Sequence, residues 1–244
     1  MVVMSAPDAE LSLDSVELPR SRWRRLFLPV TYSYAAVLVS VTIMLSVLSE
    51  ATQNRVVLHA STNLHNLWRG RFGTLLSSAL VIGDGWNAAV VIIPLLVCLL
   101  VLAEKRFGAV RLLWIFFAGH IGATLLVAAG LWVAVSANWL PFDITQVADV
   151  GVSYGAIALI GSFIAVVPAR WVPTWAIVWL MVAVTGVIMG RTFTNVGHLV
   201  AVSIGLAAGY WLVRSGRSEL RRLHGWEAGL LVAASVLGYV VLVG

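Results

Sequence analysis

Charged residues are scarce in this chain. Only 11% of its 244 residues are Asp, Glu, Lys or Arg, whereas 60% are apolar. A soluble domain of this length could not bury so much apolar surface, whereas helices that face lipid have no need to hide theirs. The composition therefore excludes an ordinary soluble protein and predicts an all-α integral membrane protein.

Cysteine and lysine are nearly absent. The single cysteine, Cys98, lies within an apolar run, so the chain has no internal disulfide and no Cys-x-x-Cys metal motif. His59 and His65 have no carboxylate or cysteine at ligand spacing. We therefore expect no metal and no cofactor. Lys105 is the only lysine among sixteen basic residues, a bias associated with GC-rich bacterial genomes, and we expect a bacterial plasma membrane protein.

The net charge of +5 does not predict nucleic-acid binding. The basic residues stand in short clusters between apolar runs, which is the pattern of topology signals in membrane proteins. The expected partners are the lipid bilayer and transmembrane proteins, and no nucleic acid.

Seven apolar runs are each close to the ~20 residues that cross a hydrocarbon core of ~30 Å. They cover residues 26–48, 86–103, 112–135, 150–167, 171–189, 196–213 and 227–244. A further apolar segment, 72–82, has about half the length that spans a bilayer. It lies in a long connection, residues 49–85, which we expect to dock against the bundle or to dip into the outer leaflet.

The basic residues orient these spans. With the N-terminus in the cytoplasm, twelve of the sixteen basic residues lie inside, and only Arg55, Arg69, Arg71 and Arg191 lie outside. The organisation predicted is a cytoplasmic tail at 1–25, a six-helix core at 26–213 with an outer loop at 49–85, and a cytoplasmic basic linker with a seventh helix at 214–244.

Two polar residues stand near the beginning of apolar spans that run in the same direction. Ser153 lies about 4–5 Å below the start of the fourth span, and His198 about 3 Å below the start of the sixth, at a rise of ~1.5 Å per residue. Both therefore lie just under the outer surface. A serine hydroxyl becomes an effective nucleophile when a base removes its proton, and a histidine of near-neutral pKa suits that role.

Small residues accompany both candidates. Gly151 and Gly155 flank Ser153. After His198, small residues recur every fourth position at Ala201, Gly205 and Gly209. Such a stripe lets two helices approach closely, and it shares a face with His198. We expect the stripe to press His198 towards the fourth span.

Each polar residue also has an ordinary structural interpretation. A serine in a membrane helix commonly bonds its own backbone, and a histidine there is commonly a packed interhelical donor. We interpret His120, deeper in the third span, as such a donor. A transporter would need several ionisable residues along one path, and Arg111, His120 and His198 are too few.

The order and spacing of these motifs resemble the rhomboid family of intramembrane serine proteases across residues 26–213. Gly151-Val152-Ser153 resembles the family's GxSG motif, with Ala158 and Gly161 at the expected spacing beyond it. His198 with Gly205 resembles His-x-x-Gly-x-x-x-Gly, with Ala201 in place of the first glycine. Two segments resemble the end of the family's first loop, namely Ser77-Ser78-Ala79-Leu80 and Gly85-Trp86.

The resemblance implies a six-plus-one bundle in which Ser153 and His198 form a catalytic dyad, supported by Gly151, Gly155 and Gly205. Such a protein cleaves transmembrane substrates near the outer leaflet. Active members also carry His-x-x-x-Asn on the second helix, where this chain has Ala88 and Ile92. A pseudoprotease that binds transmembrane segments without cleaving them is therefore the alternative.

The chain departs from the family pattern at two further positions. Tyr154 replaces the glycine after the serine, and Ile157 stands where the family has an aromatic residue that stacks on the histidine.

Overall fold

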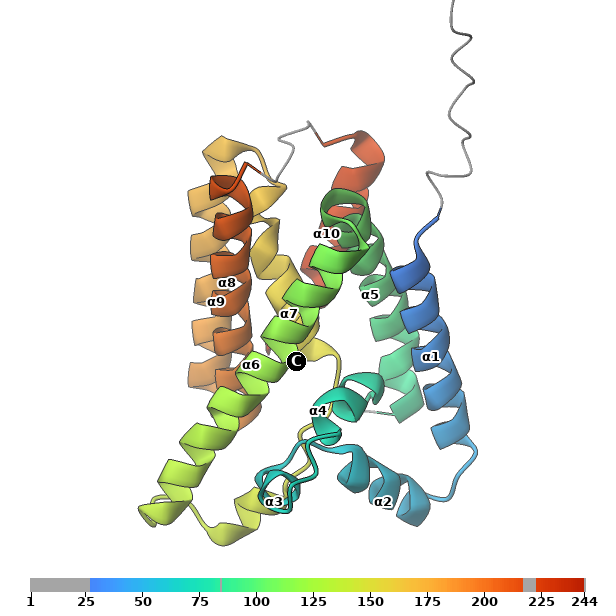
Figure 1. The fold of residues 1–244 in the computed structure, drawn as a ribbon, viewed down its shortest axis with the longest axis vertical. Coiled ribbons are helices and arrows are strands. Elements are labelled where there is room, and N and C mark those ends of the chain that lie inside the picture. The colour runs from blue at the N-terminus through green and yellow to red at the C-terminus, as the bar shows by residue number, and fades with distance from the viewer. Residues whose placement is uncertain (1–26, 84, 217–222, 244) are drawn as a thin grey trace, which may run out of the picture.

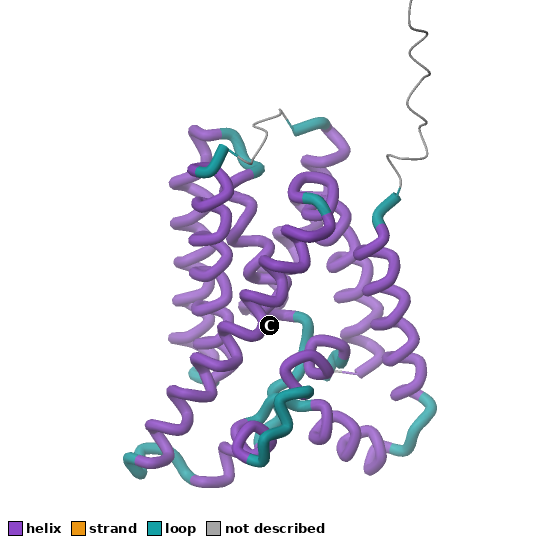
Figure 2. Tube along the Cα trace, viewed as in Figure 1, coloured by secondary structure: helices purple, strands orange, loops and turns teal. Residues whose placement is uncertain are grey.

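The computed structural model describes residues 27–83, 85–216 and 223–243, and within them it contains helices and loops but no strand (Figure 2). The expected tail at 1–25 and residues 217–222 of the expected basic linker lie outside these ranges. A helix satisfies its interior backbone hydrogen bonds within its own segment, as crossing a bilayer requires.

Six helices are long and apolar enough to cross a membrane. They are α1 (Pro29–Ser46), α5 (Gly85–Phe107), α6 (Ala109–Ser136), α8 (Val172–Gly190), α9 (Phe193–Arg214) and α10 (Gly225–Val243). Together with the shorter apolar helix α7, they confirm a multi-pass all-α membrane bundle.

Helix α7 (Ser153–Ser162), with the 3₁₀ turn η4 (Phe163–Ala165) that follows it, is shorter than the expected span 150–167. Gly151 has a φ of 130°, which places this residue outside a helix. All residues of α7 after Ser153 are buried. Because α7 is enclosed by protein rather than by lipid, it need not match the thickness of the hydrocarbon core.

The other helices surround α7 (Figure 1). Helix α7 packs mainly against α9 and α6, and it also contacts α5 and α10. Helix α8 packs against α9, and α1 packs against α5. Helix α10 packs against both α5 and α8, so it closes the circle of helices around α7.

The connection 49–85, which keeps the name outer loop from its expected side of the membrane, contains α2 (Glu50–Ala60), α3 (Leu64–Trp68), α4 (Thr74–Ser77) and the 3₁₀ turn η2 (Ser78–Leu80). Further 3₁₀ turns are η3 (Phe142–Gln146) and η5 (Ala169–Trp171). The half-length apolar segment 72–82 docks against the bundle, because Ala79 is fully buried and its carbonyl accepts a 2.6 Å hydrogen bond from Tyr34 of α1.

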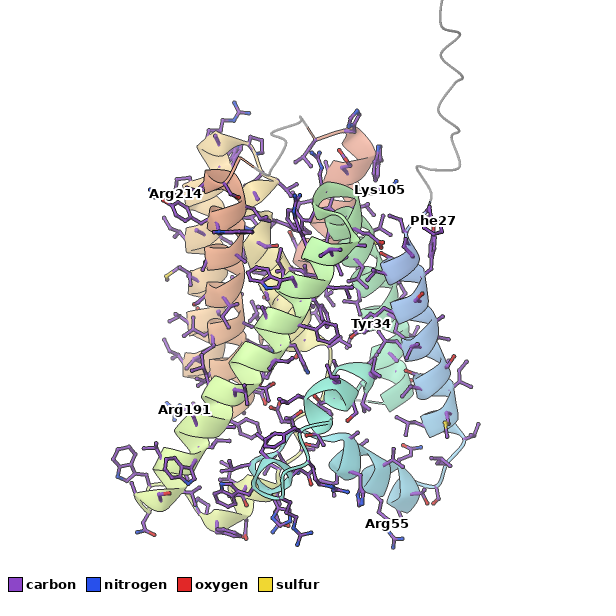
Figure 3. The ribbon with its side chains drawn as sticks, viewed as in Figure 1. Phe27, Tyr34, Arg55, Lys105, Arg191 and Arg214 are labelled. Carbon is purple, nitrogen blue, oxygen red and sulfur yellow. The ribbon has the colours of Figure 1, made fainter. Side chains whose placement is uncertain are left out.

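Basic side chains mark both ends of the bundle. Lys105 and Arg214 lie towards one end, and Arg55 and Arg191 towards the other (Figure 3). This separation agrees with the alternating direction of the spans. At the first end, the Arg106 guanidinium at the end of α5 forms a 2.7 Å ion pair with Glu227 of α10, and both side chains are buried.

Candidate active site

Ser153 is the first residue of α7, at the end of that helix that contacts the outer loop, and it is half-buried. The backbone reaches it through Gly151, whose positive φ is a conformation that side chains with a Cβ rarely adopt. The hydroxyl is thus presented at the first turn of a rigid, buried helix.

His198 stands in the second turn of α9 and is 4% exposed. Neither of its ring nitrogens has a hydrogen-bond partner within the part of the chain that the structure describes. A neutral imidazole has one donor and one acceptor, and leaving such groups buried without partners costs about 1–3 kcal/mol each. Unpaired buried groups of this kind are uncommon and call for a functional explanation.

Tyr154 fills the space between α7 and α9 at this level. Its ring centroid lies 5.3 Å from that of His198, with the planes at 77°, and 6.4 Å from that of His120. A Cβ at Gly197 would overlap the Tyr154 ring, so the glycine makes room for it. The two helices therefore touch where Ser153 and His198 stand, but no hydrogen bond joins these two residues among the described contacts.

Sequence reasoning noted Tyr154 only as a departure from a glycine and missed its position. The available signal was Gly197, directly before His198, which frees space for one large ring. The Tyr154 hydroxyl is buried near Asp149, but no hydrogen bond of ordinary geometry engages it among the described residues. Burial raises the pKa of the Asp149 carboxyl to about 6, and the Tyr154 hydroxyl partly opposes this shift.

The expected stripe of small residues lies against α7. A Cβ at Gly205 would overlap the Ala158 carbonyl oxygen, and one at Gly209 would come within 2.5 Å of the Ser162 carbonyl oxygen. Ala201 is fully buried. Gly155 has a different neighbour, because a Cβ there would meet the Phe116 ring of α6 at 2.5 Å.

His120 bonds to the outer loop. Its Nε2 lies 3.1 Å from the Ser78 hydroxyl, and both side chains are buried. The residue was expected to link two helices, and the structure shows instead that it links α6 to the 3₁₀ turn η2.

On α5, the two positions that correspond to the His and the Asn of the family motif carry apolar side chains. Ala88 and Ile92 are half-buried and have no polar side-chain atom, and Asn87 is exposed. The backbone N–H groups at the start of α7 thus remain the donors nearest Ser153 in sequence. The described residues contain no group of three or more His, Cys, Asp or Glu side chains placed to hold a metal ion.

Comparison with known proteins identifies the family. No match was found among curated proteins or among solved structures. The family described as "Rhomboid-like protein" matches residues 25–219, which include α1 to α9 and both candidate residues. The chain therefore belongs to the rhomboid-like protein family.

Proposed function

We propose that this chain is an intramembrane serine protease that uses Ser153 as nucleophile and His198 as general base. The observation that carries the proposal is the buried His198 ring, whose two nitrogens are unpartnered among the described residues and which packs against the residue next to Ser153. An imidazole kept free of structural hydrogen bonds is available for proton transfer.

In the proposed reaction, one ring nitrogen of His198 removes the proton from the Ser153 hydroxyl as the oxygen attacks a substrate carbonyl carbon. The protonated imidazole then gives this proton to the leaving amine. Water attacks the resulting ester in the same way and regenerates the serine. The attack requires Ser153 Oγ to come within ~2.6–3.2 Å of the nitrogen, and catalytic hydrogen bonds are often longer before substrate binds.

The position of Ser153 favours a transmembrane substrate. The hydroxyl lies at the outer end of a helix enclosed by other helices, so a peptide bond reaches it only where a substrate helix unwinds near the outer leaflet. An unwound segment exposes backbone groups that lipid cannot satisfy, which favours their transfer into a protein site. The substrates we propose are therefore transmembrane proteins.

A second candidate function is a pseudoprotease that binds transmembrane segments without cleaving them. The apolar side chains of Ala88 and Ile92 favour it, because losing one oxyanion donor costs about 10²–10³ in rate. The absence of a Ser153–His198 hydrogen bond among the described residues points the same way.

The two functions are separated by labelling with a fluorophosphonate probe in detergent. The protease predicts labelling of the wild type that is lost in Ser153→Ala and strongly reduced in His198→Ala. Ser203→Ala is the matched control, because Ser203 lies on α9 near His198 but is exposed and bonds its own helix at the Leu199 carbonyl. Labelling that does not depend on Ser153 would reject the protease and favour the pseudoprotease.

For the location, we propose a bacterial plasma membrane with the N-terminus in the cytoplasm. The distribution of basic residues supports this orientation. Single cysteines placed at Arg55 and at Arg214, in a Cys98→Ala background, should react with an impermeant maleimide from outside intact cells only at position 55. Reaction only at position 214 would reverse the topology.

A further inference from the structure

The segment directly before Ser153 is held by the outer loop. The Thr62 N–H donates to the Asp149 carbonyl at 3.0 Å, and the Asp149 N–H donates to the Ser61 hydroxyl at 2.7 Å. The Gly151 N–H donates to the Ser78 carbonyl at 2.9 Å. Three backbone groups within four residues of the candidate nucleophile are thus fixed by contacts with a distant part of the chain.

Ser78 in turn is fixed by side chains. Its hydroxyl lies 2.6 Å from the Thr62 hydroxyl and 3.1 Å from His120 Nε2. All three residues are at most 2% exposed. His120 belongs to the long helix α6, so this contact ties the outer loop to the membrane-embedded bundle.

The direction of the hydrogen bonds among Thr62, Ser78 and His120 depends on where each hydroxyl group donates its proton. Thr62 Oγ1 also lies 2.9 Å from the Thr74 carbonyl oxygen, which can only accept. If Thr62 donates to this carbonyl, Ser78 donates to Thr62 and His120 Nε2–H donates to Ser78. In the reverse direction Ser78 donates to His120 Nε2, and the ring N–H faces the Leu75 backbone of the same loop. In either direction His120 ties α6 to the outer loop through Ser78.

We propose that His120 is a positioning residue for Ser153. Its contact with the Ser78 hydroxyl fixes the η2 turn, and the Ser78 carbonyl then fixes Gly151 and the beginning of α7. His120 acts through these residues and does not touch the substrate. This inference rests on the proposed function of Ser153, but the geometry of the segment 149–151 can be measured without activity.

The test compares His120→Leu, which removes both ring nitrogens, with His120→Gln, whose amide places a donor and an acceptor near the same position. Hydrogen exchange of the full chain in detergent should show faster exchange in a peptide covering 147–153 for His120→Leu, with α9 peptides unchanged. His120→Gln should resemble the wild type. His59→Leu is the control, because His59 is exposed in the same outer loop.

The labelling rate of Ser153 is the second readout. A displacement of about 1 Å can cost up to ~100-fold in rate, so we expect His120→Leu to label about 10- to 100-fold more slowly. Ser78→Ala removes this contact and also the contact with Thr62, so it should be at least as impaired as His120→Leu. The double variant should be little worse than Ser78→Ala, because both substitutions break the Ser78–His120 contact.

The inference is overturned if exchange at 147–153 is unchanged in His120→Leu. It is also overturned if exchange rises equally along the whole chain, or if His120→Gln is as impaired as His120→Leu. Absence of labelling in the wild type would instead reject the proposed function. In that case the exchange result still decides whether His120 holds the segment.

Discussion

The Asp149 carboxyl is the acidic side chain nearest to Ser153 in sequence. Its pKa is raised to about 6 by burial, so in the folded protein the carboxyl retains its proton at higher pH than usual. A raised carboxyl pKa means that the folded state binds the proton more tightly than the unfolded chain. The contribution to stability is present at low pH and is lost as the pH rises through about 6.

We therefore expect this carboxyl to favour folding at pH 5 over pH 7 by about 1 kcal/mol. Thermal unfolding in detergent, compared between the wild type and Asp149→Asn, measures the difference. The amide side chain of this variant does not titrate, so the variant should lose that part of the pH dependence. Asp143→Asn, at an exposed position in the same connection, is the control. An identical pH dependence in wild type and Asp149→Asn would contradict the prediction.

Individual contacts were the part of the site that sequence could not predict. Span direction and helix rise put Ser153 three residues and His198 two residues into their spans. In the structure Ser153 is the first residue of α7, and His198 lies five residues beyond the first residue of α9. The position of the Tyr154 ring could not be predicted, because a large side chain points to where a neighbouring helix leaves space for it. Here that space is left by Gly197. The hydrogen-bond partner of His120 could not be predicted either, since Ser78 lies 42 residues away in a loop without periodicity.

The contact between α7 and α9 depends on glycine because the two backbones nearly touch. An added Cβ at Gly205 has no flexible side chain to displace, since the obstacle is the Ala158 carbonyl. Gly205→Ala should therefore lower the free energy of unfolding by about 1–3 kcal/mol and reduce Ser153 labelling.

Gly130→Ala on α6 is the matched control for this substitution. A Cβ at Gly130 meets nothing within 4 Å, and the helix should gain up to ~1 kcal/mol from the better helix former. Thermal unfolding of both variants in detergent checks the difference. Equal effects at positions 205 and 130 would show that the α7–α9 contact is looser than the structure indicates.

At the level of elements, hydropathy predicted the long helices well because lipid thickness imposes one length on every lipid-facing span. The third span, expected at 112–135, is α6 at Ala109–Ser136. Helix α7 is shorter than this length because it is surrounded by protein and not by lipid. Hydropathy singled out the segment 72–82 of the outer loop, but it could not decide whether the loop docks against the bundle or dips into the leaflet. The buried Ala79 shows that this segment docks.

In the whole molecule, α10 completes the enclosure of α7. A Cβ at Gly238 would come within 2.6 Å of the Trp179 ring of α8 and 2.8 Å of Ile160 of α7, so α10 lies close to both. At its beginning, Glu227 accepts from Arg106 of α5 at 2.7 Å and from the His224 backbone at 2.9 Å. One buried carboxylate thus joins the seventh helix to the core.

We expect Glu227→Gln to lower the stability of the bundle by roughly 3 kcal/mol, because breaking a buried ion pair is strongly destabilising. Thermal unfolding in detergent measures the loss. Glu50→Gln, at an exposed position in α2, is the control and should unfold like the wild type. If both variants unfold alike, the ion pair with Arg106 does not hold α10.

The Arg106–Glu227 pair has a consequence for the biosynthesis of the protein. Placing a lone carboxylate within a membrane span costs up to ~3 kcal/mol at the centre and less towards the ends. Arg106 precedes Glu227 by 121 residues, so α5 and its cation are synthesised well before the acid. Insertion of α10 should therefore depend on earlier helices, and the same segment synthesised alone should enter membranes less efficiently.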